Sequence, residues 1–132
     1  MSVTDPIADM LSALRNASQA GRKEVVVPFS GLKERLASLL KREGFVAGAR
    51  KFKEKGGSFF FLSIELRYGE DGLPKLHCVK RVSKPSRRTY TDVKRLKSPP
   101  TGIRIISTSH GLMTSVEARK RRLGGEVIAD VW

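Results

Sequence analysis

The sequence predicts an α+β fold of two small domains, and three observations indicate it. The first half has the pattern of a helix, a strand, a helix and two further strands. A cluster of turn-forming residues, Tyr68 to Pro74, then interrupts this pattern. Short β-branched strands and one short helix follow it. We therefore expect an N-terminal αβαββ domain at residues 1–68 and a C-terminal, mostly antiparallel β domain with one short helix at residues 69–132.

Two amphipathic helices are predicted in the N-terminal domain. Asp5-Pro6 is typical of a helix start, because a capping side chain precedes proline at the first helical position. Ser30 can cap a second helix that ends at Gly44. Both helices have one apolar face, which predicts that they pack on a sheet. These faces are formed by Ile7, Met10, Leu11 and Leu14 in the first helix, and by Leu32, Leu36, Leu39 and Leu40 in the second.

The strands of this domain are predicted at residues 23–27, 45–53 and 59–66, the last two joined as a hairpin. The third strand begins with three phenylalanines, Phe59 to Phe61. Aromatic side chains on a sheet can stack on RNA bases, but phenylalanines in strands more often fill a core. We favour the core interpretation.

The C-terminal stretch carries the candidate site. A β-branched strand with Ile103, Ile105 and Ile106 stops at three hydroxyl residues, Ser107-Thr108-Ser109. Thr114 and Glu117 have the spacing of a capping box, so a helix should start there and end before Gly124-Gly125. Residues 126–132 then form a closing strand. If the two strands pair, the loops 107–111 and 124–126 lie at the same end of one sheet.

The charge indicates a polyanionic partner. The chain has 26 Lys and Arg against 13 Asp and Glu, a formal net charge of +13. The excess is larger in residues 67–132, which hold fifteen basic and six acidic side chains. Basic charge alone does not separate RNA from DNA or an anionic membrane. The forked donors of Arg87 and Arg88 suit phosphates, Lys84 adds charge, and Tyr90 can stack on a sugar or base.

Other function classes have little support. Ser107 and Ser109 lack the G-x-S-x-G elbow of serine hydrolases, and no phosphate-binding glycine motif is present. Cys78 is the only cysteine, and with two histidines it cannot supply the four ligands of a structural zinc site. No apolar run approaches the roughly 20 residues of a membrane span. We therefore expect a cytoplasmic protein that is not an enzyme and has no cofactor, no metal, no membrane association and no small-molecule substrate.

The chain also resembles a known family. The stretch GIRIISTSHGLMT, followed by EAR and GGE and ending in VW, is similar to the C-terminal signature of ribosomal protein eight of the bacterial small subunit. The opening TDPIADML with Arg15-Asn16-Ala17, and the middle segments PFS and LLKREGF, resemble the same family. The resemblance spans the whole chain. Arg122 departs from it, because a helix-ending glycine is common at this position.

The resemblance implies that the chain contacts the central domain of 16S ribosomal RNA, lies beside other small-subunit proteins and assists assembly. It also implies which residues contact RNA. In the C-terminal half they are Ser107, Thr108, Ser109, Gly124, Gly125, Glu126 and Tyr90 with its basic neighbours Lys84, Arg87 and Arg88. A second contact region is expected at Thr4, Asp5 and Arg15. The alternative hypothesis is a general DNA-binding or nucleoid protein, although the sequence has no helix-turn-helix pattern.

Overall fold

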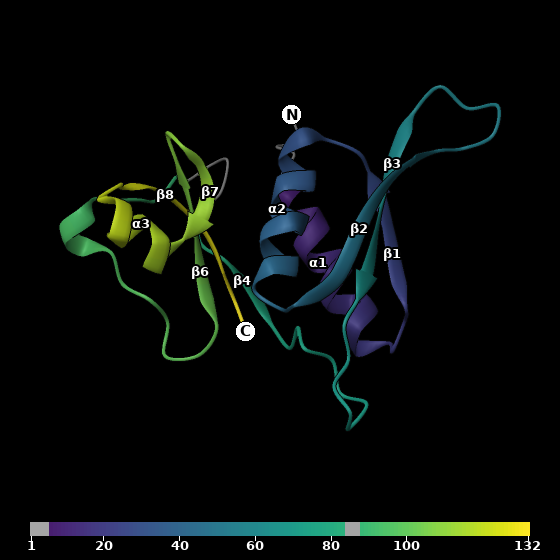
Figure 1. Cartoon of the computed structure of the whole chain (residues 1–132), viewed down its shortest axis with the longest axis horizontal. Helices are drawn as coiled ribbons and strands as arrows, with labels where there is room; N and C mark the ends of the chain where they lie inside the picture. Colours follow the sequence, from purple (N-terminus) through teal and green to yellow (C-terminus); the bar gives the residue numbers. More distant parts are fainter. Residues whose placement is uncertain (1–5, 84–87) are drawn as a thin grey trace. The chain divides into compact units, whose positions relative to one another are not determined.

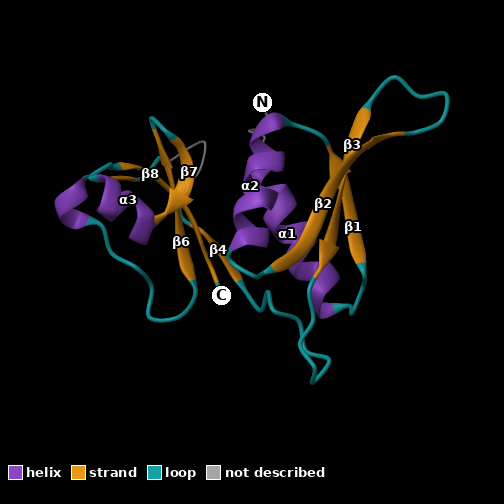
Figure 2. Ribbon diagram, viewed as in Figure 1, coloured by secondary structure: helices purple, strands orange, loops and turns teal. Residues whose placement is uncertain are grey.

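The computed structural model describes residues 6–83 and 88–132 (Figures 1 and 2). They divide into two compact units, Pro6–His77 and Cys78–Trp132. Helices and antiparallel strands occur in both units, so the predicted α+β class is confirmed.

The N-terminal unit has the predicted order of elements. They are α1 (Pro6–Gln19), β1 (Glu24–Pro28), α2 (Gly31–Arg42), β2 (Val46–Lys53) and β3 (Phe60–Leu66). The strands form one antiparallel sheet in the order β1-β3-β2. The predicted hairpin is the pair β2 and β3, whose register runs from Val46 opposite Leu66 to Lys53 opposite Phe60.

The helices bury most of the apolar faces that the sequence predicts. All four apolar residues named for the first helix are buried in α1. Ser30 caps α2, and its hydroxyl oxygen accepts a hydrogen bond from the backbone N–H of Lys33 at 3.2 Å. The prediction is wrong for Leu32, which is 42% exposed. At this first turn Lys33 is the buried residue, and its ammonium group donates to the carbonyl oxygen of Pro28 at 3.1 Å.

The end of the β2–β3 hairpin projects beyond the two helices (Figure 1). The prediction of a phenylalanine core is therefore wrong for Phe59 and Phe60, which are 78% and 46% exposed. They lie at or next to the loop, where no helix covers the sheet. Phe61 is half-buried, and its ring centroid lies 5.9 Å from that of Phe52 on the neighbouring strand.

The C-terminal unit is mostly antiparallel sheet with one short α-helix, as predicted. The sheet has the order β4-β8-β6-β7, and β5 pairs with the free part of β8. A 3-10 turn, η1 (Val93–Arg95), and α3 (Ser115–Arg121) complete this unit. Its strands are β4 (Val79–Arg81), β5 (Tyr90–Thr91), β6 (Ile103–Thr108), β7 (Gly111–Thr114) and β8 (Gly125–Val131).

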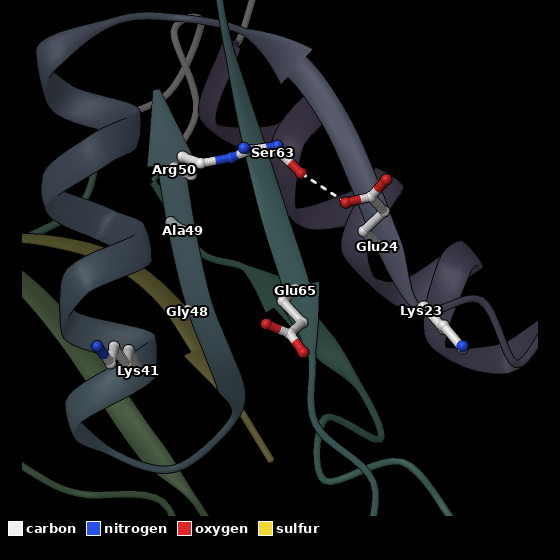
Figure 3. A pocket seen from close by; sticks show the side chains of 8 residues that line it. All are labelled: Lys23, Glu24, Lys41, Gly48, Ala49, Arg50, Ser63 and Glu65. Carbon is white, nitrogen blue, oxygen red and sulfur yellow. Dashed lines mark hydrogen bonds between the residues drawn. The ribbon is translucent and has the colours of Figure 1, made fainter. Parts of the chain in front are cut away.

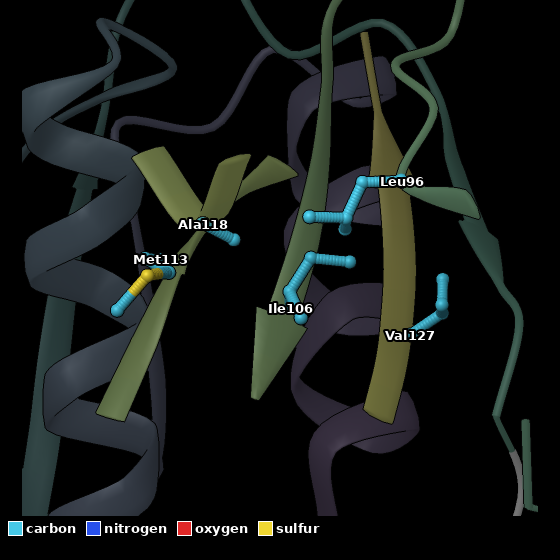
Figure 4. Close-up of a cluster of buried hydrophobic side chains, with 5 residues drawn as sticks. All are labelled: Leu96, Ile106, Met113, Ala118 and Val127. Atoms are coloured by element: carbon cyan, nitrogen blue, oxygen red, sulfur yellow. The ribbon is translucent and has the colours of Figure 1, made fainter. Parts of the chain in front are cut away.

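The core of this unit lies between the sheet and α3 (Figure 4). Ile106 on β6 and Val127 on β8 stand opposite each other. Both belong to a buried cluster with Leu96, Met113 and Ala118 of α3. Burial of such side chains stabilises the fold by roughly 1.5–3 kcal/mol for each large residue. The cluster thus fixes the ends of β6 and β8 side by side.

Caps at both ends fix the position of α3. The hydroxyl oxygen of Thr114 accepts a hydrogen bond from the backbone N–H of Glu117 at 3.2 Å, so the predicted start of the helix is confirmed. Arg122 ends the helix in the left-handed conformation, with φ 57° and ψ 46°. It is the only residue other than glycine with positive φ in the described ranges 6–83 and 88–132.

Candidate nucleic-acid interface

The hydroxyl segment and the glycine segment meet in the C-terminal sheet. Strands β6 and β8 are antiparallel neighbours, and Ser107 stands opposite Glu126. The expected proximity of the two segments is therefore present. The prediction that both are entirely loops is wrong, because Ser107 and Thr108 belong to β6, and Gly125 and Glu126 belong to β8. Their backbone groups are paired with neighbouring strands.

Tyr90 extends this arrangement across a third strand. It stands opposite Glu126 on the other side of β8, so Ser107, Glu126 and Tyr90 form a row across β6, β8 and β5. Directly opposite residues in an antiparallel sheet point to the same face. Ile106 and Val127 point into the α3 core, and the residues next to them in each strand point to the opposite face. The row therefore faces away from this core, and Tyr90 is 69% exposed.

The three hydroxyl residues have different surroundings. The hydroxyl of Thr108 donates to the carbonyl oxygen of Gly111 at 2.9 Å and accepts from the backbone N–H of His110 at 3.0 Å. These bonds stabilise the tight turn between β6 and β7. In the part of the chain that the structure describes, the hydroxyls of half-buried Ser107 and exposed Ser109 have no hydrogen-bond partner. Both can bond to a ligand without breaking a contact within those residues.

The glycine pair has a structural reason within the sheet. A Cβ atom on Gly125 would lie 2.1 Å from the carbonyl oxygen of Ser107, and one on Gly124 would lie 2.6 Å from that of Thr91. Both distances are far below van der Waals contact. The two glycines therefore let β6, β5 and β8 approach closely, which holds the row together.

Glu126 is paired within the chain. Its carboxylate accepts hydrogen bonds from the hydroxyl of Ser83 and from the guanidinium of Arg88, the latter at 2.8 Å. Burial opposes ionisation of this carboxyl, but the two hydrogen bonds and the charges of Arg88 and Arg81 outweigh it, so the pKa of Glu126 is lowered. Glu126 is therefore compatible with a polyanionic partner, because the charge of Arg88 already balances that of its carboxylate.

Sequence reasoning missed Ser83. Its side chain is fully buried, and its hydroxyl also accepts a hydrogen bond from the backbone N–H of Thr89 at 3.1 Å. It thereby orients Glu126 and connects to the chain at Thr89, six residues further on. A single serine among basic residues carries no sequence signal for such a contact with residue 126.

The other predicted site residues lie in the N-terminal unit or outside the described residues. Arg15 lies in α1 of the N-terminal unit and is half-buried. Thr4, Asp5, Lys84 and Arg87 lie outside the described residues.

A pocket in the N-terminal unit offers no clear catalytic arrangement (Figure 3). Its one hydroxyl, that of Ser63, donates to the carboxylate of Glu24 at 2.8 Å. Its remaining lining residues include Lys23, Arg50 and Glu65, with no histidine to activate the serine. Within residues 6–83 and 88–132, no three His, Cys, Asp or Glu side chains cluster as metal ligands. No helix in these same ranges has the length and apolar character needed to cross a membrane.

These features define a class: a basic α+β protein whose C-terminal sheet presents hydroxyls and an exposed tyrosine beside an arginine-paired glutamate. The sequence model of one family, described as "Ribosomal protein S8", matches residues 5–132. The chain therefore belongs to this family, which comprises structural proteins and not enzymes. The resemblance seen in the sequence is confirmed.

Relatives named "Small ribosomal subunit protein uS8" match along the whole chain. The protein of Bifidobacterium animalis subsp. lactis (strain AD011) is 45% identical over 134 residues and covers 100% of both chains. That of Tropheryma whipplei (strain Twist) is 46% identical with the same coverage. The Rhodopirellula baltica protein is 44% identical over 131 residues, which is 98% of each chain.

Proposed function

We propose that this chain is a structural constituent of the small ribosomal subunit in the cytoplasm. In this role it binds the central domain of 16S ribosomal RNA directly, helps this RNA to fold during assembly and lies beside other proteins of the subunit. Membership of a ribosomal protein family and the names of its relatives support the ribosomal role. No cofactor, metal or small-molecule substrate is part of the proposal.

The observation that carries the RNA-binding proposal is the row of Ser107, Glu126 and Tyr90, with Ser109 in the adjoining turn. Hydroxyl groups can donate to and accept from ribose 2′-hydroxyls and base edges. The ring of Tyr90 is available for stacking on a base or sugar. Because these groups are mounted on paired strands, they are held in fixed positions before the RNA arrives.

The positive charge of the C-terminal half supports the same surface as the site of RNA binding. The segment from Lys75 to Arg104, which includes β4 and β5, has ten basic residues and one acidic residue. Contacts with phosphates supply affinity without sequence preference, whereas contacts with bases and 2′-hydroxyls supply specificity. The proposed interface combines both kinds of group.

A general DNA-binding role has only the positive charge in its favour. A helix-turn-helix protein places a recognition helix in the major groove, while its other helix crosses the DNA backbone. In the described part of the C-terminal unit, the single α-helix is α3, with seven residues. Its Ala118 is buried in the core of the unit.

A competition experiment tests the proposal. The whole protein is bound to a labelled transcript of the 16S central domain, and unlabelled duplex DNA of equal length is added at equal nucleotide concentration. We expect the transcript to remain bound at physiological salt, because DNA offers charge but neither 2′-hydroxyls nor the folded RNA shape. Displacement by the duplex at equal concentration would contradict RNA recognition.

A further inference from the structure

A second exposed cluster lies at the end of the β2–β3 hairpin, in the N-terminal unit. Phe59, the most exposed large apolar side chain among those described, directly precedes the exposed Phe60, and the half-buried Phe29 lies beside Phe60. The backbone N–H of Phe29 donates to the carbonyl oxygen of Phe60 at 3.1 Å, which places these two residues side by side. Exposed aromatic side chains grouped in this way are typical of binding surfaces.

Two lysines belong to the same cluster. The ammonium of Lys51 lies 4.2 Å from the ring centroid of Phe29 and 4.4 Å from that of Phe60. The ammonium of Lys53 lies 5.8 Å from the ring of Phe60. These are cation–π distances, so the rings hold the positive charges in place. No carboxylate forms an ion pair with Lys51 or Lys53 in the stretches that the structure describes.

The chemistry of the cluster favours a strand of RNA over a protein. An apolar protein partner would have to remove water from two lysines without neutralising them, which is costly. A nucleic-acid strand satisfies both parts of the surface, because its phosphates neutralise the lysines and its bases stack on the rings. Proteins that bind single strands combine the same two features. The family of this chain makes RNA the relevant nucleic acid.

We propose that the end of the β2–β3 hairpin is a second RNA contact, in which an unpaired base stacks on Phe59 while Lys51 and Lys53 attract the adjacent phosphates. Phe60 takes part indirectly, because its ring positions the two ammonium groups. Within the described residues, no cation or second ring lies against the ring of Phe59, so it is open to a base. This surface goes beyond the proposed function and uses none of the residues of the row.

The experiment measures binding of the whole protein to a fluorescent oligouridylate of about ten nucleotides, within the site sizes of single-strand-binding proteins. We expect Phe59→Leu to weaken binding at least about fivefold, because leucine keeps the apolar character but loses the flat ring. Phe59→Trp should bind at least as tightly as the unchanged protein. The salt dependence should be the same in all three proteins, because no charge is altered.

Leu73→Ala is the matched control. Leu73 is 58% exposed in the same unit and lies in the loop that follows β3. It should leave oligouridylate binding unchanged. Urea denaturation of each variant checks that the fold is retained, as the exposure of Phe59 predicts. Equal binding by Phe59→Leu and Leu73→Ala would overturn the proposal.

One further arm identifies the partner. If Phe59→Leu weakened binding to fluorescent polyglutamate but not to oligouridylate, the cluster would be a protein-binding surface and the proposal would be wrong.

Discussion

At the scale of single residues, two neighbouring hydroxyls at the end of β6 have opposite surroundings. Thr108 makes two hydrogen bonds that shape the turn to β7. Ser109 is exposed, and no other side chain or backbone group bonds to its hydroxyl in the described structure. A polar group that makes no contact within the protein contributes little to stability, but it can contribute to binding. The two positions therefore separate folding from recognition.

Ser109→Ala should leave the free energy of unfolding unchanged within about 0.5 kcal/mol, as for most exposed substitutions. It should weaken binding to the 16S central domain by about 1–3 kcal/mol, because a group on the RNA is then left without its partner. Urea denaturation and filter binding measure the two effects. Thr108→Ala is the control, and its main effect should be to lower the free energy of unfolding. Unchanged RNA affinity of Ser109→Ala would remove Ser109 from the interface.

Glu126 should make stability depend on pH in the acidic range. Its pKa is lowered in the folded chain, so the unfolded chain takes up a proton first as the pH falls. The contribution of the carboxylate is therefore complete above the ordinary glutamate pKa and is lost as the pH falls through the lowered value. Glu126→Gln should be less stable than the unchanged protein at about pH 7, and the difference should shrink by about pH 3. Urea denaturation at both pH values measures it, and a difference independent of pH would refute this role.

At the scale of elements, α3 ends at a residue poorly suited to its conformation. Arg122 has φ 57°, and a side chain in the left-handed region costs roughly 1–2 kcal/mol compared with glycine. Arg122→Gly should therefore raise the free energy of unfolding by about 1 kcal/mol, measured by urea denaturation. Arg121→Gly makes the same chemical change one residue earlier, inside the helix, and should lower stability by about 1 kcal/mol. The same sign for both changes would contradict this account of the helix end.

The close approach of β6 and β8 should also be sensitive to a single methyl group. In Gly125→Ala, the new Cβ atom would meet the carbonyl oxygen of Ser107, which is backbone and cannot move aside alone. We expect a loss of about 1–3 kcal/mol in stability, as for other substitutions that overfill a packed site. Gly48→Ala is a control for the loss of glycine flexibility in a strand, because Gly48 in β2 has no positive φ and nothing lies within 4 Å of an added Cβ. Urea denaturation compares them, and an effect no larger than that of Gly48→Ala would contradict the steric explanation.

Most elements were predictable because their signals are local. The capping box of α3, the apolar faces of both N-terminal helices and the β2–β3 hairpin depend on residues a few positions apart. The last residues of β6 were not predicted as strand because serine and threonine favour turns, and β7 was not predicted because it has only four residues and begins with glycine. Here their backbone groups are paired between strands, and this pairing overrides the local preference.

At the scale of the whole molecule, the sequence predicted which segments meet but not the contacts that hold them. The proximity of Ser107 to Glu126 followed from expecting two antiparallel strands to pair. The bond between Ser83 and Glu126 joins residues 43 positions apart, and no periodicity indicates it. The exposure of Phe59 also depends on where the helices stop covering the sheet. The domain limits 1–68 and 69–132 stay a prediction, whereas the two compact units meet in sequence between His77 and Cys78.

The distribution of charge leads to a prediction for the whole chain. Three exposed cations follow β5, which pairs with the start of β8, and should therefore lie close enough to the row to contact phosphates; they are Lys94, Arg95 and Lys97. Changing all three to glutamine should weaken binding to the 16S central domain. It should also reduce the slope of log affinity against log salt by roughly one unit for each phosphate that the protein no longer neutralises.

The matched control changes the same number of exposed cations in the N-terminal unit: Arg22, Lys23 and Arg35. Its net charge is identical, so any effect of total charge on long-range attraction is the same in both variants. Filter binding over a range of salt concentrations compares them. A smaller slope in the first variant alone would show that the phosphates lie against the C-terminal sheet. Equal slopes would mean that the position of these charges is unimportant and would count against the row as the principal interface.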